Sequence, residues 1–275
     1  MESLAEMSKV SVYIIAYNEI EKVAATIASA QWADEIVLVD SWSTDGTPEL
    51  AEKLGARVVQ VDFQGFGKLR NQAVSACSHE WILSLDADER CTEEVALELR
   101  NLISDPNAAD VYRVPRRNFF MGRWIKHSGW YPNYRQPQFF RRGCMSYDQK
   151  AVHEGYIVNS SKPVGHLKNA IWQFPFRNME EVLHKANRYS TLGAKRIAQR
   201  PRSMGTALFH GLWAFVKHYL FKLGFMDGWA GFVIALQSFE GTFYRYVKAI
   251  EIQKGELWQA PKHNTDRART STKAI

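Results

Sequence analysis

The sequence predicts an α/β fold in which a mostly parallel, Rossmann-like sheet is flanked by helices and followed by a helical, aromatic-rich C-terminal region. Short apolar runs alternate with helical patterns over about the first 100 residues, and each pair of parallel strands needs such a helical crossover. Beyond residue 200 the chain becomes rich in Trp, Phe, Leu and Tyr. Its 275 residues are 46% hydrophobic, which is enough to bury a large core.

The first part of the chain contains four predicted strands. Each is a short apolar run without Gly or Pro: Val10–Ala16, Glu35–Val39, Arg57–Val61 and Glu80–Leu85. Helical patterns lie between them, over Ile20–Gln31, Thr47–Leu54 and Lys68–Ala76. Ligands of such sheets bind beyond the carboxyl ends of the strands. The polar clusters that follow the strands are therefore expected to share one rim: Tyr17 to Glu19, Asp40 to Asp45, and Asp86 to Glu89.

The later part of the chain has a different composition. Thr92–Leu102 is predicted to be a helix that begins close to a capping pattern, and Asn178–Ala198 an amphipathic helix that ends before Pro201. Between residues 111 and 150 nine Arg or Lys stand against one Asp and are interleaved with aromatic residues. This pattern indicates a basic, aromatic surface.

The aromatic segment Ala207–Val247 is interrupted by charged residues. Its longest uncharged stretch, Gly228–Phe239, has 12 residues, whereas a membrane-spanning helix needs about 20. The composition along the chain predicts four parts: an α/β half over residues 1–110, a basic, aromatic half of the same domain over 111–200, a helical region over 201–258, and a disordered basic tail over 259–275.

Charge and cysteine content indicate which partners and which cellular compartment to expect. The formal net charge of +6 suits anionic partners, whether nucleic acid, phospholipid head groups or phosphorylated small molecules. The three cysteines, Cys77, Cys91 and Cys144, form no CxxC pair, which favours free thiols in a reducing cytoplasm. Residues 1–9 lack a basic start followed by an apolar stretch, so no cleaved secretory signal is expected.

The WILSLDADE segment carries the first candidate site. If Leu83 to Asp88 stays extended, Asp86 and Asp88 point to the same side, because side chains alternate along a strand. Two carboxylates placed in this way can hold Mg²⁺ or Mn²⁺ together with substrate phosphates. The alternative is an acidic strand terminus, or a helix cap before Thr92.

Two more segments could contact a nucleotide. The carboxylate of Asp40 can accept hydrogen bonds from a ring N–H or a ribose hydroxyl, and the alternative is that it caps the turn at Ser41–Gly46. Gly65–Asn71 can bring Lys68, Arg70 and backbone N–H groups toward a phosphate at a helix start. It matches neither a GxGxxG loop nor a Walker loop.

Four ordered motifs together resemble the inverting family 2 glycosyltransferases, which have the GT-A fold: AYNE (16–19), WADEIVLVDSWSTDGT (32–47), GFGKLRNQA (65–73) and WILSLDADER (81–90). More narrowly, the chain is similar to the lipopolysaccharide core β-1,4-glucosyltransferases, which transfer glucose from UDP-glucose to an inner-core heptose. The similarity continues through WYPNYRQPQFFRR (130–142), VHEGY (152–156), NRYSTLGAKR (187–196) and KLGFMDGWAGFVIA (222–235). It covers most of the chain, and it implies that residues 1–110 bind the nucleotide sugar and residues 111–200 bind the acceptor.

The resemblance implies roles for matching residues. Asp40 would bind the uracil or the ribose, and Arg70 and Asn71 match the RN of a family helix near the donor. Asp88, with Asp86 nearby, would reach the Mg²⁺ or Mn²⁺ on the donor diphosphate, and the metal would stabilise the leaving nucleotide. The other donor-binding residues predicted at this rim are Tyr17, Asn18, Glu19 and Lys68. Trp42 is a departure, because many relatives carry a small residue there.

Inverting transfer needs a general base that takes the proton from the attacking acceptor hydroxyl. Glu154 is predicted to be this base, since it is an isolated acid that follows the cationic region. His153 is predicted to contact the metal or the diphosphate, and a hydrogen-bonded structural histidine is the alternative.

The basic, aromatic surface is predicted to bind the acceptor. Trp130 and Tyr131 offer flat surfaces for sugar rings, and Arg135 belongs to a group of cations that can meet the phosphates of a lipid-linked acceptor. For any single arginine of this group the alternative is a solvated charged face. Ala207–Val247 either packs as core helices or lies in the membrane interface. Because family members act on an acceptor embedded in the inner membrane, the resemblance implies peripheral attachment to its cytoplasmic face.

Other functions remain open at this level. A nucleic-acid binder would also place positive charge among aromatic residues, but it would not explain DAD, Asp40 and RN on one sheet rim, and no recognised RNA-binding signature is present. We therefore expect no nucleic-acid partner. A non-catalytic sugar-nucleotide scaffold is a further alternative, as is a transferase that uses another nucleotide sugar or another membrane glycan.

Overall fold

The computed structural model describes residues 8–134, 136–148 and 155–255. Its main sheet has seven strands in the order β12-β6-β9-β4-β1-β2-β3. The four strands of the first part of the chain run parallel to one another: β1 (Val10–Ala16), β2 (Glu35–Asp40), β3 (Arg57–Gln60) and β4 (Trp81–Asp86). The predicted parallel α/β arrangement of this part is confirmed.

The other half of the sheet is mixed. β9 (Pro137–Arg141) runs antiparallel to β4 and to β6 (Val111–Arg113), and β12 (Gly165–His166) pairs parallel with β6 at the edge. The rings of Trp81 and Phe139 stack across the β4/β9 pair with centroids 4.8 Å apart. This stacked, fully buried pair joins the two halves of the sheet.

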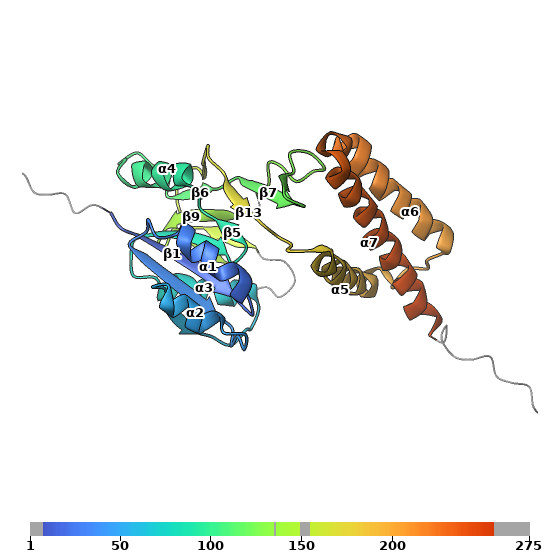
Figure 1. Ribbon diagram of the computed structural model, residues 1–275, viewed down its shortest axis with the longest axis horizontal. Helices are drawn as coiled ribbons and strands as arrows, with labels where there is room; N and C mark the ends of the chain where they lie inside the picture. Colours follow the sequence, from blue (N-terminus) through green and yellow to red (C-terminus); the bar gives the residue numbers. More distant parts are fainter. Residues whose placement is uncertain (1–7, 135, 149–154, 256–275) are drawn as a thin grey trace, which may run out of the picture.

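Helices cover both faces of the sheet because side chains alternate along each strand (Figure 1). On one face, Val12 and Ile14 of β1 pack in a core with three helices: α1 (Ile20–Ser29), α2 (Thr47–Lys53) and α4 (Glu93–Ile103). On the other face, Tyr13 and Ile15 pack in a core with α3 (Phe66–Ala76) and β10 (Met145–Tyr147). The Thr92 side chain accepts a hydrogen bond from Val95 N at 3.3 Å, so the capping pattern predicted there is confirmed.

Two smaller sheets extend the main one. β5 (Glu89–Arg90), β13 (Ile171–Gln173), β7 (Arg116–Phe120) and β8 (Arg123–Trp124) form a four-stranded sheet, and β10 pairs with β11 (Tyr156–Val158). β5 begins three residues after β4 ends, so this sheet holds the segment that follows β4.

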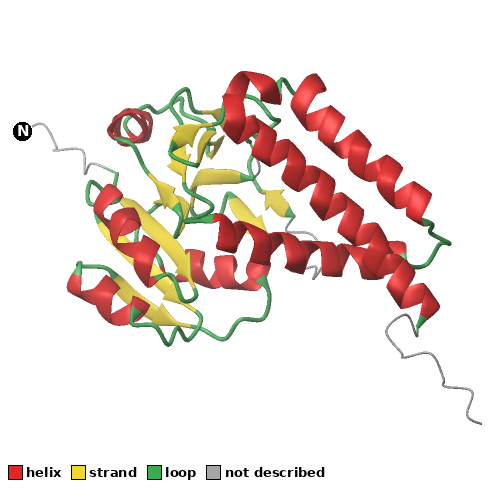
Figure 2. Cartoon of the chain, turned by 45° about the vertical axis from the view of Figure 1, so that its right-hand side comes forward, coloured by secondary structure: helices red, strands yellow, loops and turns green. Residues whose placement is uncertain are grey.

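The C-terminal part is a group of helices beside the sheets (Figure 2). It contains α5 (Met179–Ile197), α6 (Met204–Val216), a π-helical turn at Lys217–Phe221, a 3₁₀ turn at Gly224–Asp227 and α7 (Gly228–Lys254). Both α5 and α6 pack on α7. The helical region therefore begins with α5, and the expected boundary at residue 200 falls after its first helix.

Within the described ranges, no single helix is long and apolar enough to cross a membrane. The segments Met204–Phe221 and Gly224–Lys254 meet that criterion only as a pair, and they are bent by 69° relative to each other. The predicted tail beyond residue 258 lies outside the described residues.

The condition for placing Asp86 and Asp88 on one side of an extended strand is not met. β4 ends at Asp86, and Ala87 and Asp88 form a turn before β5, so Leu83 to Asp88 is not continuously extended. The turn leads the chain from β4 into the second sheet, where Glu89 pairs with β13 and its carboxylate is fully buried. The strand alternation on which we placed Asp86 and Asp88 on one side therefore does not apply.

Candidate active site

The carboxyl ends of β1 and β2 carry an interlinked pair of loops. Asn18 N donates to Ser43 Oγ at 2.8 Å, and Asn18 Oδ1 accepts from Thr44 N at 2.9 Å. Glu19 N donates to Thr47 Oγ1 at 3.0 Å. The expectation that Tyr17–Glu19 and Asp40–Asp45 share one rim is confirmed.

Asp40 lies at the centre of this rim and is fully buried. One of its oxygens accepts from Ser43 N at 2.7 Å, and the other accepts from Ser43 Oγ. These contacts are those of the turn-capping alternative. A contact between Asp40 and a nucleotide stays a prediction.

Two aromatic side chains project from the same loops. Tyr17 is 61% exposed and Trp42 is 60% exposed. Trp42 has a left-handed backbone (φ 60°), and its indole N–H donates to Asp62 Oδ1 at 2.8 Å. The departure from the family pattern therefore produces a fixed, exposed indole beside the Asp40 loop.

Arg70 of α3 fixes the end of β4. Its guanidinium is buried and donates to Asp86 Oδ1 at 2.7 Å and to Ser84 Oγ at 3.1 Å. The guanidinium also lies over the ring of Tyr147, 5.6 Å from its centroid. Arg70 and Asp86 are thus brought together at the rim, as the predicted site requires.

The other two donor-binding residues predicted on α3 make different contacts. Asn71 Nδ2 donates to Tyr147 O at 2.8 Å, and its Oδ1 accepts from Tyr147 N at 2.9 Å, which fastens α3 to β10. Lys68 Nζ donates to Gln64 Oε1 at 2.8 Å. The amide of Asn71 is occupied by the backbone, and donor contacts by Asn71 and Lys68 stay predictions.

Asp88 lies in the turn after β4, near Asp86. Its carboxylate accepts from Gln173 Nε2 at 3.2 Å, and its carbonyl accepts from Phe174 N at 2.8 Å. Burial raises the pKa of Asp88 and the charge of Asp86 raises it further, whereas Gln173, Lys22 and Lys185 lower it. Burial and the neighbouring carboxylate thus disfavour the anionic form of Asp88.

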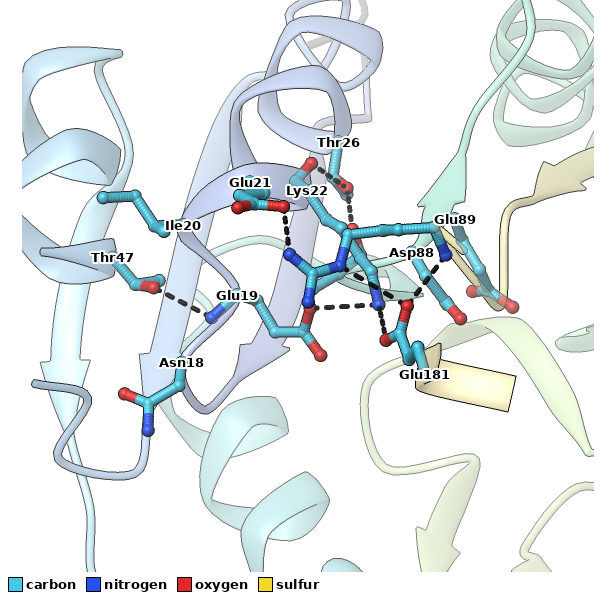
Figure 3. Close-up of polar contacts among 12 residues, drawn as sticks. Asn18, Glu19, Ile20, Glu21, Lys22, Thr26, Thr47, Asp88, Glu89 and Glu181 are labelled. Carbon is cyan, nitrogen blue, oxygen red and sulfur yellow. Dashed lines mark hydrogen bonds and ion pairs between the residues drawn. The ribbon is translucent and has the colours of Figure 1, made fainter. Parts of the chain in front are cut away.

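Lys22 of α1 pairs with the helical region (Figure 3), and its charge lowers the pKa of Asp88. Its ammonium lies 2.9 Å from Glu181 Oε1 on α5 and 3.4 Å from Glu19 Oε2. Its side chain is only 10% exposed. No sequence pattern indicates this role of Lys22, because it lies off the apolar face of α1, where a lysine normally faces solvent.

Glu89 is a structural residue beside these acids. Its fully buried carboxylate pairs with Arg116 and accepts from Asp86 N at 3.0 Å and from Gln138 Nε2 at 2.9 Å. Glu89 therefore holds the backbone of Asp86 in place. No local pattern in the sequence identifies Arg116 as its partner, because the two residues belong to different strands.

Trp130 and Tyr131, two of the residues predicted to bind the acceptor, lie between the second sheet and the helices. Trp130 is partly buried and packs edge-on against Phe120, with centroids 5.7 Å apart, and Tyr131 packs edge-on against Trp124 at 5.3 Å. Trp130 also lines a groove of about 410 Å³ with residues of α5, α6 and α7, among them Lys185 and Arg245. A larger depression of about 750 Å³ lies between α1, α4 and β13, away from the Asp40 loop.

Three predicted residues fall outside the described ranges: Arg135, His153 and Glu154. Their roles stay predictions.

Comparison with known proteins decides the family. Residues 11–163 match the family model described as "Glycosyl transferase family 2". The chain belongs to this family. It is a glycosyltransferase, and the family together with the mixed sheet flanked by helices confirms the predicted GT-A type of fold.

Relatives of this family 2 glycosyltransferase extend over nearly its whole length. The chain is 30% identical to the lipopolysaccharide core biosynthesis glycosyltransferase LpsC of Rhizobium meliloti, with 94% of this chain and 96% of LpsC covered. It is 28% identical to an uncharacterized glycosyltransferase of Rickettsia felis, with 94% and 98% covered. A solved structure of S. aureus TarS (residues 1–349) is 16% identical, with 91% of this chain and 93% of that chain covered and a TM-score of 0.47.

The acids of this glycosyltransferase fit a divalent cation. Asp86 and Asp88 offer hard oxygen ligands, and a cation would relieve the electrostatic cost of keeping Asp88 ionised beside Asp86. In the part of the chain that the structure describes, no group of three His, Cys, Asp or Glu side chains surrounds a common centre. With two protein carboxylates, the donor diphosphate would complete the shell.

Proposed function

We propose that this family 2 glycosyltransferase transfers a hexose, with glucose from UDP-glucose as the first candidate, to an inner-core heptose of lipopolysaccharide. The observation that carries the proposal is the placement of Asp86 and Asp88 after β4, on the same sheet edge as the Asp40 loop. The full-length similarity to LpsC supports lipopolysaccharide core as the acceptor class.

The residues of the rim have distinct tasks in this proposal. The loops at Asn18 and Asp40 form the surface that binds the nucleoside, and Tyr17 and Trp42 supply exposed rings beside this surface. Arg70 holds Asp86, and Glu89 holds the backbone of Asp86, so the two acids keep a fixed position. A bound Mg²⁺ or Mn²⁺ would neutralise charge that develops on the departing UDP.

The acceptor side supplies the base and the position of the nucleophile. Glu154 takes the proton from the acceptor hydroxyl as its oxygen attacks C1 of the sugar from the face opposite the UDP, which inverts the anomeric configuration. Trp130, Tyr131 and Arg135 orient the acceptor, and His153 contacts the metal or the diphosphate. The reaction takes place at the cytoplasmic face of the inner membrane, with the region 207–247 attached peripherally.

The test is a donor panel. Purified protein is incubated with several UDP-sugars and with lipopolysaccharide truncated at the inner core, in Mn²⁺, Mg²⁺ or EDTA. One UDP-sugar should give product, and EDTA should remove that product. Failure of every UDP-sugar, or full product formation in EDTA, would contradict the proposal. Metal-dependent hydrolysis of the donor without acceptor separates an enzyme from a binding scaffold.

A single substitution tests the base. Glu154→Gln should lower the rate of transfer by about 10²–10⁴-fold, since general-base catalysis contributes on that order. Binding of the UDP-sugar, measured by calorimetry with the same metal, should change little. Glu52→Gln is the control, because Glu52 is an exposed glutamate on α2. Wild-type turnover by Glu154→Gln would remove Glu154 from the mechanism.

A further inference from the structure

The connection between α6 and α7 is a sharp, irregular bend, here called the helix bend and comprising residues 217–229. α6 ends in the π-helical turn, Leu223 adopts a left-handed backbone (φ 54°), and a 3₁₀ turn leads into α7. The two helical segments differ in direction by 69°. The bend lies at the end of the helix pair that faces the loop after β7 (Figure 1).

The helix bend exposes a dense set of large apolar side chains. Six of them are 44–68% exposed within ten consecutive positions: Leu220, Phe221, Leu223, Phe225, Met226 and Trp229. Exposed apolar residues scattered singly are normal in soluble domains, but contiguous patches mark surfaces that become covered. The bend is therefore a candidate docking surface.

The charge around the helix bend is positive. Lys217 and Lys222 are exposed in the bend, Arg123 is exposed on β8, and Lys126 is exposed on the adjacent loop. The Arg123 guanidinium packs close to Gly228, and the Lys222 stem packs close to Gly129. Asp227 is the one acid within residues 217–229, and it is buried. Apolar tips between exposed cations match the interface of an anionic bilayer, where Lys and Arg meet the head groups.

The helix bend is also fastened to the loop that carries Trp130. Asp227 accepts from Lys126 N at 3.1 Å, from His127 N at 3.1 Å and from Ser128 Oγ at 2.8 Å. Ser128 N donates to Lys222 O at 2.8 Å. A bend embedded in a membrane would thus carry residues 126–130 to the membrane surface as one unit.

We propose that the helix bend inserts its apolar side chains into the interface of an anionic phospholipid bilayer, and that Asp227 thereby holds the Trp130 loop at the height of a lipid-linked acceptor. The second part rests on the proposed function. A second copy of this chain is a poorer occupant, because a symmetric contact would place Lys217 and Lys222 of both copies against each other.

Vesicle sedimentation with the full chain tests the docking surface. Wild-type protein should sediment with vesicles of phosphatidylethanolamine and phosphatidylglycerol and much less with phosphatidylcholine alone. Phe221→Glu and Trp229→Glu should each weaken binding to the anionic vesicles by at least about tenfold, since they place a like charge in an apolar contact with an anionic surface. Lys217→Gln should weaken binding to anionic vesicles only.

The matched control is Ile252→Glu. Ile252 is 52% exposed on α7, like Leu220 at the bend, but it lies about 35 Å along the helix from Trp229. Its variant should bind vesicles as the wild type does. Unchanged binding of both bend variants would overturn the proposal. So would concentration-dependent self-association of the wild type, without lipid, that Phe221→Glu abolishes.

The link to the acceptor loop is tested by transfer. Ser128→Ala removes one bond to Asp227 and should leave vesicle binding intact, while transfer to acceptor embedded in vesicles falls several-fold. Transfer to the same acceptor dispersed in detergent should change little, and equal losses in both assays would refute the link. If the wild type binds vesicles through the bend yet transfers no sugar to any acceptor, the proposed function fails and the docking surface stands.

Discussion

Glu89 carries a fully buried charge that is matched by the buried guanidinium of Arg116. Burying two charges is costly, and the pair contributes through position: Glu89 also accepts from Asp86 N and from Gln138. The carboxylates predicted to hold the metal thus depend on an acid that does not face the donor.

Arg116→Met should destabilise the protein by about 3–5 kcal/mol, because Glu89 would stay buried without its partner. Urea unfolding measures this change. Arg177→Met is the control: the pair of Arg177 and Glu21 is 47% and 64% exposed, and such pairs contribute about 0–1 kcal/mol. Equal effects of the two substitutions would mean that Glu89 finds another partner.

Glu35 offers a prediction on pH. Burial would raise its pKa, but hydrogen bonds from Arg57, Ser11 and Ser78 outweigh burial and lower the pKa from 4.5 to about 2. A depressed pKa stabilises the folded state above the unfolded value of 4.5, and this contribution is lost as the pH falls from 4.5 toward 2.

Glu35→Gln should therefore lower the free energy of unfolding at neutral pH by roughly 1–2 kcal/mol, a value reduced for partial solvent screening. The difference from the wild type should shrink through that acidic window. Denaturant unfolding of both proteins at a series of pH values measures it. A difference that stays constant with pH would show that the loss is not one of charge.

At the scale of elements, α7 is positioned by a close backbone approach. A Cβ added at Gly231 would lie 1.9 Å from Gly224 O, so the first turns of α7 and the 3₁₀ turn can pack only with glycine there. A Cβ added at Gly241, on the same helix, would meet nothing within 4 Å. Packing therefore requires a glycine at position 231 but not at position 241.

Gly231→Ala should destabilise the helical region by roughly 1–3 kcal/mol, because backbone must move to admit the methyl group. Gly241→Ala should be neutral or stabilising by up to about 1 kcal/mol, since alanine favours a helix over glycine. Thermal unfolding and limited proteolysis of α6 and α7 compare them. If the ranking is reversed, the packing of Gly231 on Gly224 is not what positions α7.

At the scale of the whole molecule, charged residues join the helical region to the sheet. Lys22 of α1 pairs with Glu181 of α5, and Arg177 pairs with Glu21 and Glu181 (Figure 3). Burial would lower the pKa of Lys22, but its bonds to Glu181 and Glu19 raise it above its ordinary value. Lys22 therefore stays charged, and its charge also acts on Asp88, whose pKa it lowers.

Glu181→Gln should weaken the contact between α1 and α5. We expect a loss of about 1.5–3 kcal/mol, typical of a hydrogen bond to a charged group, and faster hydrogen exchange in the first turns of α1 and α5. Glu180→Gln is the control, because Glu180 is the adjacent residue and its side chain is 79% exposed. Unaltered exchange in Glu181→Gln would mean that apolar packing alone holds α5 against the sheet.

The sequence by itself determined the parallel half of the sheet, the helices between its strands, the cap at Thr92, and the rim that holds Asn18 and Asp40. These features depend on local signals: the period of apolar residues, the chemistry of caps and the direction of parallel strands. The ordered motifs also indicated the family, because they contain the residues that form this rim.

Only the tertiary structure decided how the acids are held. One example is the turn at Asp88. Another is the pair of Glu89 and Arg116, which are 27 positions apart, and a third is the contact of Lys22 with Glu181, which are 159 positions apart. Asp227 likewise meets Lys126 across 101 positions. Such contacts depend on the path of the whole chain, and no local periodicity encodes them, so a buried partner and a solvated charge look alike in the sequence.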